Sequence, residues 1–241
     1  MFARDLIKIL REDFLDDNNS RKYLWDDPSL LRRISEAERQ VCQRIDVIFD
    51  DTTPKYCHIT LVEGQSSYTF DRKISRFVNV IFDGDVLDKT TKDDLDRKQP
   101  TWRTDTNLTD NIVEYVVSGR QIRFSRIPNA TDAGKIVYLE IYRYPDQAIR
   151  SENQEPEIPE EFHRDLIWWV LHECYKKQDA DTFDQERSNQ HLLRFNEIFG
   201  DPIPAAVRQH QFESPEGLHI LPTPYVKKRR ASVSSDPSIW E

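Results

Sequence analysis

The histidines of this chain could do chemistry, but their spacing does not favour a shared site. His172 is followed by Glu173, yet the second histidine that a zinc-binding helix needs is absent. His163 and His172 are nine positions apart, so in one helix they point to opposite sides. We therefore interpret both as structural or surface histidines and predict no metal site.

The acidic and hydroxyl side chains give no catalytic pattern either. The pairs Asp50-Asp51 and Asp93-Asp94 could act as general acid and base, but turns commonly carry aspartate at such positions. Ser66-Ser67 lacks the surroundings of a nucleophile elbow. The six glycines form no phosphate-binding loop. The sequence predicts a protein that is not an enzyme and has no cofactor.

Composition and cysteine usage limit the class of protein. The 241 residues carry a net charge of -9, which argues against tight binding of nucleic-acid phosphates. No apolar run approaches the roughly 18 residues needed to cross a bilayer, and no signal-peptide pattern opens the chain. Cys42, Cys57 and Cys174 are odd in number and far apart, so we expect buried thiols rather than disulfides. We expect a soluble protein made in the cytoplasm.

The two ends of the chain have helical periodicity. Apolar residues predict a helix over 2–14 and a second helix that runs to about Ile48. The second helix is preceded by Asp26-Asp27-Pro28, an aspartate cap with proline just inside. Pro156 and the acidic residues after it predict the start of another helix, and a last helix follows Asp181 and stops at Gly200. The predicted core of the bundle is Leu6, Leu10, Trp25, Leu31, Ile34, Ala37, Phe162, Leu166, Trp169, Val170 and Phe195.

The middle of the chain has the composition of β-strands. We predict six short strands, at 56–62, 67–70 (pairing back on the first), 76–82, 112–117, 121–127 and 135–144. The long connection between the third and fourth contains a predicted helical turn at 92–97 and Trp102, which could be a binding anchor or local packing.

This order of elements predicts an α+β fold with an insertion. Residues 1–51 and 148–201 form one helical bundle, and residues 52–147 form an inserted antiparallel β-sandwich or barrel. Residues 202–241 are rich in proline and predict an extended arm, either disordered or ordered on docking, and the apolar residues in it favour docking. The docking residues that we predict are Leu218, Ile220, Leu221, Tyr225, Lys227, Lys228, Arg229, Arg230 and Trp240.

The run Trp-Asp-Asp-Pro-Ser-Leu-Leu at 25–31 is followed by Glu36-Ala37. This stretch resembles an early helix of the head-to-tail adaptor proteins of tailed bacteriophages, a family that includes head-completion adaptors and upper tail-tube proteins. Four further stretches resemble it in the same order: Leu95-Asp96 with Trp102, 120–128, 158–166 and 181–199.

The resemblance implies a structural connector in the virion. It implies a ring of about twelve copies beneath the portal protein, joined to a tail tube or nozzle protein, with genome DNA passing through the lumen. The location that it implies is the portal vertex at the head-tail interface, after synthesis in the host cytoplasm.

Two other classes of function stay open from the residues. A tail module that binds the host surface or a glycan would use a face formed by Tyr115, Tyr138, Tyr142 and Tyr144, although cross-strand packing explains such tyrosines more simply. A hydrolase that uses acidic loops is the third, and it lacks the motifs of known catalytic sites.

Overall fold

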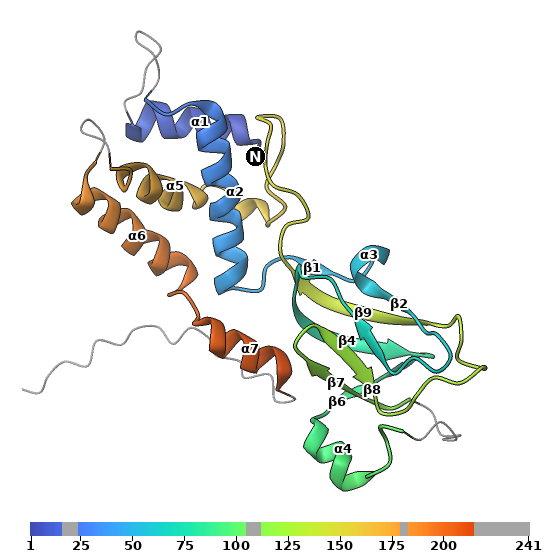
Figure 1. The fold of residues 1–241 in the computed structure, drawn as a ribbon. Helices are drawn as coiled ribbons and strands as arrows, with labels where there is room; N and C mark the ends of the chain where they lie inside the picture. The colour runs from blue at the N-terminus through green and yellow to red at the C-terminus, as the bar shows by residue number, and fades with distance from the viewer. Residues whose placement is uncertain (16–23, 105–111, 179–182, 215–241) are drawn as a thin grey trace, which may run out of the picture.

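The computed structural model describes residues 1–15, 24–104, 112–178 and 183–214, and Figure 1 shows its elements. The helices are α1 Ala3–Ile9, α2 Asp27–Arg44, α3 Pro54–Cys57, α4 Lys92–Lys98, α5 Leu166–Tyr175, α6 Gln185–Phe199 and α7 Ala205–Glu213, with a π-helical turn η1 Leu10–Leu15 and a 3-10 turn η2 Glu160–Phe162. The strands are β1 Phe49–Asp50, β2 His58–Thr60, β3 Ser67–Thr69, β4 Ile74–Phe82, β5 Asp85–Val86, β6 Asp88–Lys89, β7 Glu114–Ser118, β8 Gln121–Phe124 and β9 Ile136–Arg143. The α+β fold class is confirmed.

The N-terminal helices and the helices α5 and α6 share one cluster of buried side chains. Leu6, Ile34, Val170 and Phe195 have no exposed surface and come from both ends of the chain. Nine of the eleven residues predicted for the bundle core are buried in this cluster. The other two, Phe162 and Trp169, are partly buried and pack against it. Burial of this apolar surface, at about 25 cal/mol per Å², stabilises the joining of the two chain ends.

The β region contains two sheets that contribute to a second buried cluster. One sheet has the order β1-β9-β4-β5, with β2 also paired to β9, and the other has the order β3-β8-β7-β6. Val80 and Val137 of the first sheet and Ile122 of the second are fully buried in this cluster. The prediction of a purely antiparallel region is wrong, because β6 pairs with β7 in parallel.

Two strand predictions are wrong in detail. Thr53 is the N-cap and Pro54 the first residue of a helical turn, so Tyr56 and Cys57 are helical rather than extended. Residues Ser67–Thr69 do not pair back on the preceding strand. They pair with β8 in the other sheet, and the Tyr68 hydroxyl accepts a hydrogen bond from the Val62 amide at 2.9 Å.

The helix boundaries also differ from the prediction. Helix α2 ends at Arg44, because Ile45 is extended and the chain then enters β1. After Pro156 the chain forms only the 3-10 turn η2, and the α-helix begins at Leu166. The cap of α6 is Asp184, whose side chain accepts from the Arg187 amide, whereas Asp181 lies outside the described residues.

Residues 202–214 correct the prediction of an extended arm. Pro204 occupies the N-cap position of α7, where a proline does not disturb the helix that follows. The ring of Phe212 lies 5.4 Å from Phe70 and 5.4 Å from Phe77, between ring centroids. The Lys89 ammonium donates a 2.7 Å hydrogen bond to the Phe212 carbonyl oxygen. This segment therefore packs as a helix on the β region, since Phe212 supplies an apolar anchor.

Arg143, at the end of β9, joins the segments that connect the bundle to the β region. Its Nε lies 2.6 Å from Asp50 of β1. Its Nη1 lies 2.7 Å from Glu157 in residues 144–165, which connect β9 to α5 and which we name the returning segment. Asp50 is 6% exposed and also accepts hydrogen bonds from the amides of Thr52 and Thr53. Burial alone would raise the pKa of Asp50, but hydrogen bonds from Thr53 and Arg143 hold that pKa below its ordinary value.

Glu38 of α2 fixes the same returning segment from the bundle side. Its Oε1 accepts hydrogen bonds from the backbone amides of Glu157 and Ile158. Its Oε2 has no hydrogen-bond partner among the described residues. Burial is the largest cause that raises the pKa of Glu38 to about 7, although the two amides act in the opposite direction.

We predict that Arg143→Leu lowers the free energy of unfolding by about 3 kcal/mol, because it leaves Asp50 buried and without its cation. Urea unfolding followed by circular dichroism measures the change. The control is Arg194→Leu, whose partner Glu197 lies 3.0 Å away with both side chains more than half exposed. The control should cost less than about 1 kcal/mol. Equal losses in the two variants would contradict the role of Arg143.

We predict that Glu38 makes stability fall as pH rises from about 4.5 to about 7. The folded state binds more protons than the unfolded state in this window, since the pKa of Glu38 is raised by folding. The penalty is up to about 3 kcal/mol above pH 7. Glu38→Gln should flatten this part of the stability profile, measured by urea unfolding at several pH values. Glu36→Gln, on the open side of α2, is the control and should leave the slope unchanged.

Candidate functional site

The face of α2 that points away from the bundle core is basic. Ile34, Ala37 and Val41 are fully buried on the core side. Arg32 and Arg39 are exposed on the opposite side, seven positions apart, which places them on one stripe of the helix. Helical periodicity thus separates an apolar face that joins the bundle from a charged face that borders open space.

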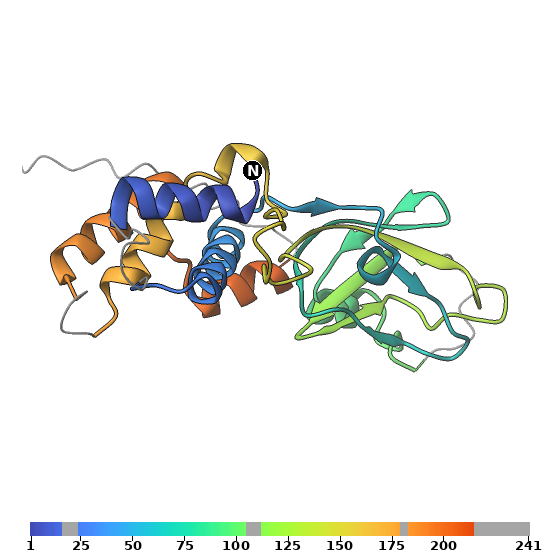
Figure 2. The same cartoon turned by 90° about the horizontal axis from the view of Figure 1, so that it is seen from above.

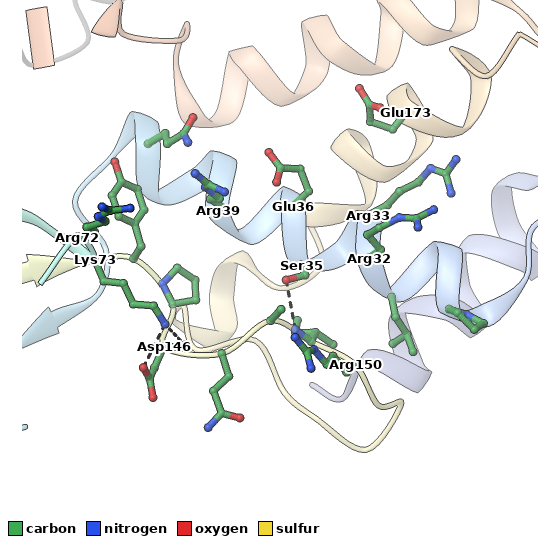
Figure 3. Close-up of a pocket in the computed structure, with 18 of the residues that line it drawn as sticks. Arg32, Arg33, Ser35, Glu36, Arg39, Arg72, Lys73, Asp146, Arg150 and Glu173 are labelled. Atoms are coloured by element: carbon green, nitrogen blue, oxygen red, sulfur yellow. Dashed lines mark hydrogen bonds and ion pairs between the residues drawn. The ribbon is translucent and has the colours of Figure 1, made fainter. Parts of the chain in front are cut away.

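This face forms the floor of a cavity with a volume of about 1230 Å³, which we name the basic cleft. Its walls come from the bundle, the returning segment, turns of the β region and α7. Figure 3 shows side chains from these elements around the exposed side of α2. The basic residues that line it are Arg32, Arg33, Arg39, Arg72, Lys73, Arg120, Arg150 and Arg208.

The cleft has the opposite charge to the whole chain. Eight basic side chains line it against the three carboxylates of Glu36, Asp146 and Glu173, while the chain carries a net charge of -9. Asp146 lies 3.1 Å from Lys55 and 3.2 Å from Lys73. Hydrogen bonds from Tyr56, and then from these two lysines, hold the pKa of Asp146 below its ordinary value. Two of the three carboxylates are thus already paired, because Glu173 has Lys176 at 3.1 Å.

Four guanidinium groups of the cleft are available to an anion. Arg39, Arg72, Arg120 and Arg150 are exposed, and none of them forms an ion pair within the part of the chain that the structure describes. They come from α2, the β3–β4 turn, the β7–β8 turn and the returning segment. The site therefore exists only when the bundle and the β region are folded against each other.

Local contacts hold the shape of the cleft. The Ser35 hydroxyl accepts a 3.2 Å hydrogen bond from the Ile149 amide, which fixes the returning segment beside α2 (Figure 3). A second cavity of about 470 Å³ borders the cleft toward α7, and Arg120, Tyr144 and Arg208 line both. Helix α7 thus closes one side of a continuous depression.

The side chains that the sequence singled out for chemistry have structural partners. The His163 ring Nε2 is 2.8 Å from the Ile158 carbonyl oxygen, and the His172 ring Nδ1 is 3.0 Å from the Ser188 carbonyl oxygen. Burial is the main cause that lowers the pKa of His172. The three cysteines are free and buried, as predicted. Within the described ranges, no group of three or more His, Cys, Asp or Glu side chains is placed to hold a metal ion.

The aromatic candidates divide into packing residues and one exposed residue. Trp102 is 1% exposed and its Nε1 donates to Asp96 at 2.7 Å, so it packs locally rather than serving as an open anchor. Tyr115 is 3% exposed, which removes it from the proposed glycan-binding face. Tyr138 is 47% exposed and its ring contacts His58. The nine residues predicted for arm docking all lie outside the described residues.

No motif in the sequence indicates the basic cleft. The only local signal was the run of arginines on the polar face of α2, and such a run is common on solvated helices. The other contributors are single basic residues in separate turns. Their convergence follows from the way that the β region folds against the bundle.

An α+β protein with a bundle at one end, a two-sheet region at the other and a charged cleft between them is suited to contacts with other macromolecules. The chain belongs to the SU10 adaptor protein family, whose model matches residues 1–216. This confirms the resemblance to phage head-to-tail adaptors and implies a structural place in the virion. No curated protein matches the sequence. Among the described residues, no helix is both long and apolar enough to cross a bilayer.

We predict that Phe212→Ala detaches α7 from the β region without unfolding the bundle. The variant loses the ring contacts with Phe70 and Phe77, so amide hydrogen exchange in residues 205–213 should rise by about tenfold or more. Exchange in α2 should stay unchanged. Val207→Ala, a truncation in the same helix, is the matched control, and equally fast exchange in that variant would contradict the anchoring role of Phe212.

Proposed function

We propose that this protein is the connector between the head and the tail of a phage particle and that it has no enzymatic activity. The observation that carries the proposal is the match to the adaptor family over residues 1–216 of the 241. In this proposal about twelve copies form a ring, because head-to-tail contacts between identical subunits close with rotational symmetry. The portal protein lies above the ring, a tail tube or nozzle protein lies below it, and genome DNA passes through the lumen.

The shape of the chain supports a connector. Figure 1 shows the bundle and the β region at opposite ends of the molecule, so each end has its own surface. The two ends have separate buried clusters. A connector needs two independent contact surfaces, and we assign the bundle to the portal side and the β region to the tail side.

The charge of the chain also supports a conduit. A net charge of -9 repels phosphates weakly, and DNA in transit must not be held by the wall of the channel. The basic cleft is positively charged and would attract DNA if it faced the lumen. In this proposal the cleft is therefore covered by protein in the ring.

The C-terminal residues supply the attachment to the portal in this proposal. Helix α7 packs on the β region through Phe212 and so fixes where the following segment begins. That segment carries Lys227, Lys228, Arg229 and Arg230, which suit an acidic partner surface. Many weak contacts, one from each copy of a ring, would together give stable attachment.

We predict that deletion of residues 215–241 abolishes attachment to the portal protein but leaves the body folded. Co-sedimentation with the purified portal protein measures attachment, and the circular dichroism melting curve of the deletion variant should match that of the full chain. A matched variant with Lys227, Lys228, Arg229 and Arg230 changed to alanine tests the charged part alone and should weaken attachment. Full attachment of the deletion variant would remove the docking role of this segment.

A further inference from the structure

A small acidic surface lies at the start of the bundle. Its members, which we name the acidic edge, are Glu155, Glu160 and Glu161, all exposed. The amino group of Met1 lies 3.5 Å from Glu155 and 3.3 Å from Glu160, with the two carboxylate side chains 50% and 82% exposed. One amino group cannot neutralise three carboxylates, so the edge keeps negative charge toward its surroundings.

The backbone holds this edge in place. The amide of Ala3 donates to the carbonyl oxygen of Gln154 at 2.9 Å, which ties the returning segment to the first turn of α1. The 3-10 turn η2 then presents Glu160 and Glu161 outward. The edge is therefore a fixed part of the fold, and its carboxylates do not need to be ordered when a partner binds.

The acidic edge and the basic cleft lie on different sides of the bundle. In Figure 2 the marked N-terminus and the gold turn η2 lie toward the upper side, and the light-blue α2 with the red α7 lies toward the lower side. The cleft is lined by the exposed face of α2 and by α7. One copy thus carries a positive depression and, at a separate place on its surface, a negative edge.

We propose that the basic cleft of one copy receives the acidic edge of the next copy. Two different, complementary patches of one chain can form a head-to-tail contact, and such contacts close into a ring when the rotation between copies allows. Arg39, Arg72, Arg120 and Arg150 then gain carboxylate partners that the single chain does not give them. The inference rests on the proposed ring and names the surfaces that build it.

A second copy fits the cleft better than DNA or the C-terminal segment does. A duplex bound in the cleft would be held by its phosphates, whereas DNA in transit through the proposed conduit must not be held. The run Lys227, Lys228, Arg229 and Arg230 has the same sign as the cleft. The acidic edge has the opposite sign and is present once in every copy, so the two surfaces occur in equal number.

The test uses charge reversal in the full chain. The cleft variant is Arg39→Glu/Arg72→Glu, the edge variant is Glu160→Lys/Glu161→Lys, and the swapped variant carries all four changes. The control is Arg97→Glu, a reversal on α4 of a side chain that is 79% exposed. Mass photometry on the purified portal protein counts bound copies. Sedimentation of the chain alone, from low to high concentration and salt, measures self-association.

The expected result is that the cleft and edge variants each need about tenfold or more higher concentration to assemble, because repulsion replaces attraction at every contact. The swapped variant should regain assembly, and the control should match the wild type. Salt should weaken assembly of the wild type, the control and the swapped variant, because it screens the attraction between the two surfaces. Unchanged assembly of the cleft variant on the portal would overturn the inference and leave the proposed connector intact.

Two further outcomes separate the inference from the proposed function. If the wild type does not bind the portal, the connector proposal fails, and sedimentation decides the contact. The contact between cleft and edge is supported if self-association is sensitive to salt, is lost in the cleft variant and is restored in the swapped variant. The contact is overturned if the wild type does not self-associate at any soluble concentration. Binding of a 30-base-pair DNA duplex by the wild type, lost in the cleft variant while rings form normally, would assign the cleft to nucleic acid instead.

Discussion

Arg143 holds together the place where the chain leaves the helical bundle and where it returns. Its guanidinium group pairs with Asp50 on the outgoing strand and with Glu157 on the returning segment, and Glu38 binds the amide of Glu157 from the bundle. A bundle made from two distant parts of a chain needs such a junction, because the inserted region would otherwise be free to change its orientation. The walls of the basic cleft depend on this constraint, since they come from both sides of the junction.

The sequence predicted the elements whose periodicity is set by one buried face. The helix α2 was predictable because Ile34, Ala37 and Val41 recur on the face that meets the bundle. The errors occurred where contacts distant in sequence decide the local structure. Strand β3 pairs with β8 and not with β2, the strand that precedes it in the sequence. The helix α7 follows two prolines, and its anchor Phe212 is apolar in a polar segment, so only the packing against the β region reveals its role.

The candidate site was far less predictable than the fold. No window of sequence contains the cleft, because Arg39, Arg72, Arg120 and Arg150 come from four separate elements. Each residue alone is typical of a solvated surface. The predictions that no catalytic or metal-binding site is present used only the spacing of residues along the chain, which can be read from the sequence alone. A surface formed by convergence requires knowledge of how the two regions are oriented, and periodicity does not contain that information.

The chain passes between the bundle and the β region three times: before β1, after β9, and between α6 and α7. A body attached at one point can swivel, and a body attached at two points can still rotate about the line that joins them. A third attachment off that line removes the last rotation, and the contacts of Phe212 with Phe70 and Phe77 secure it. Force or torque applied at one end is therefore transmitted to the other end as through a single rigid body.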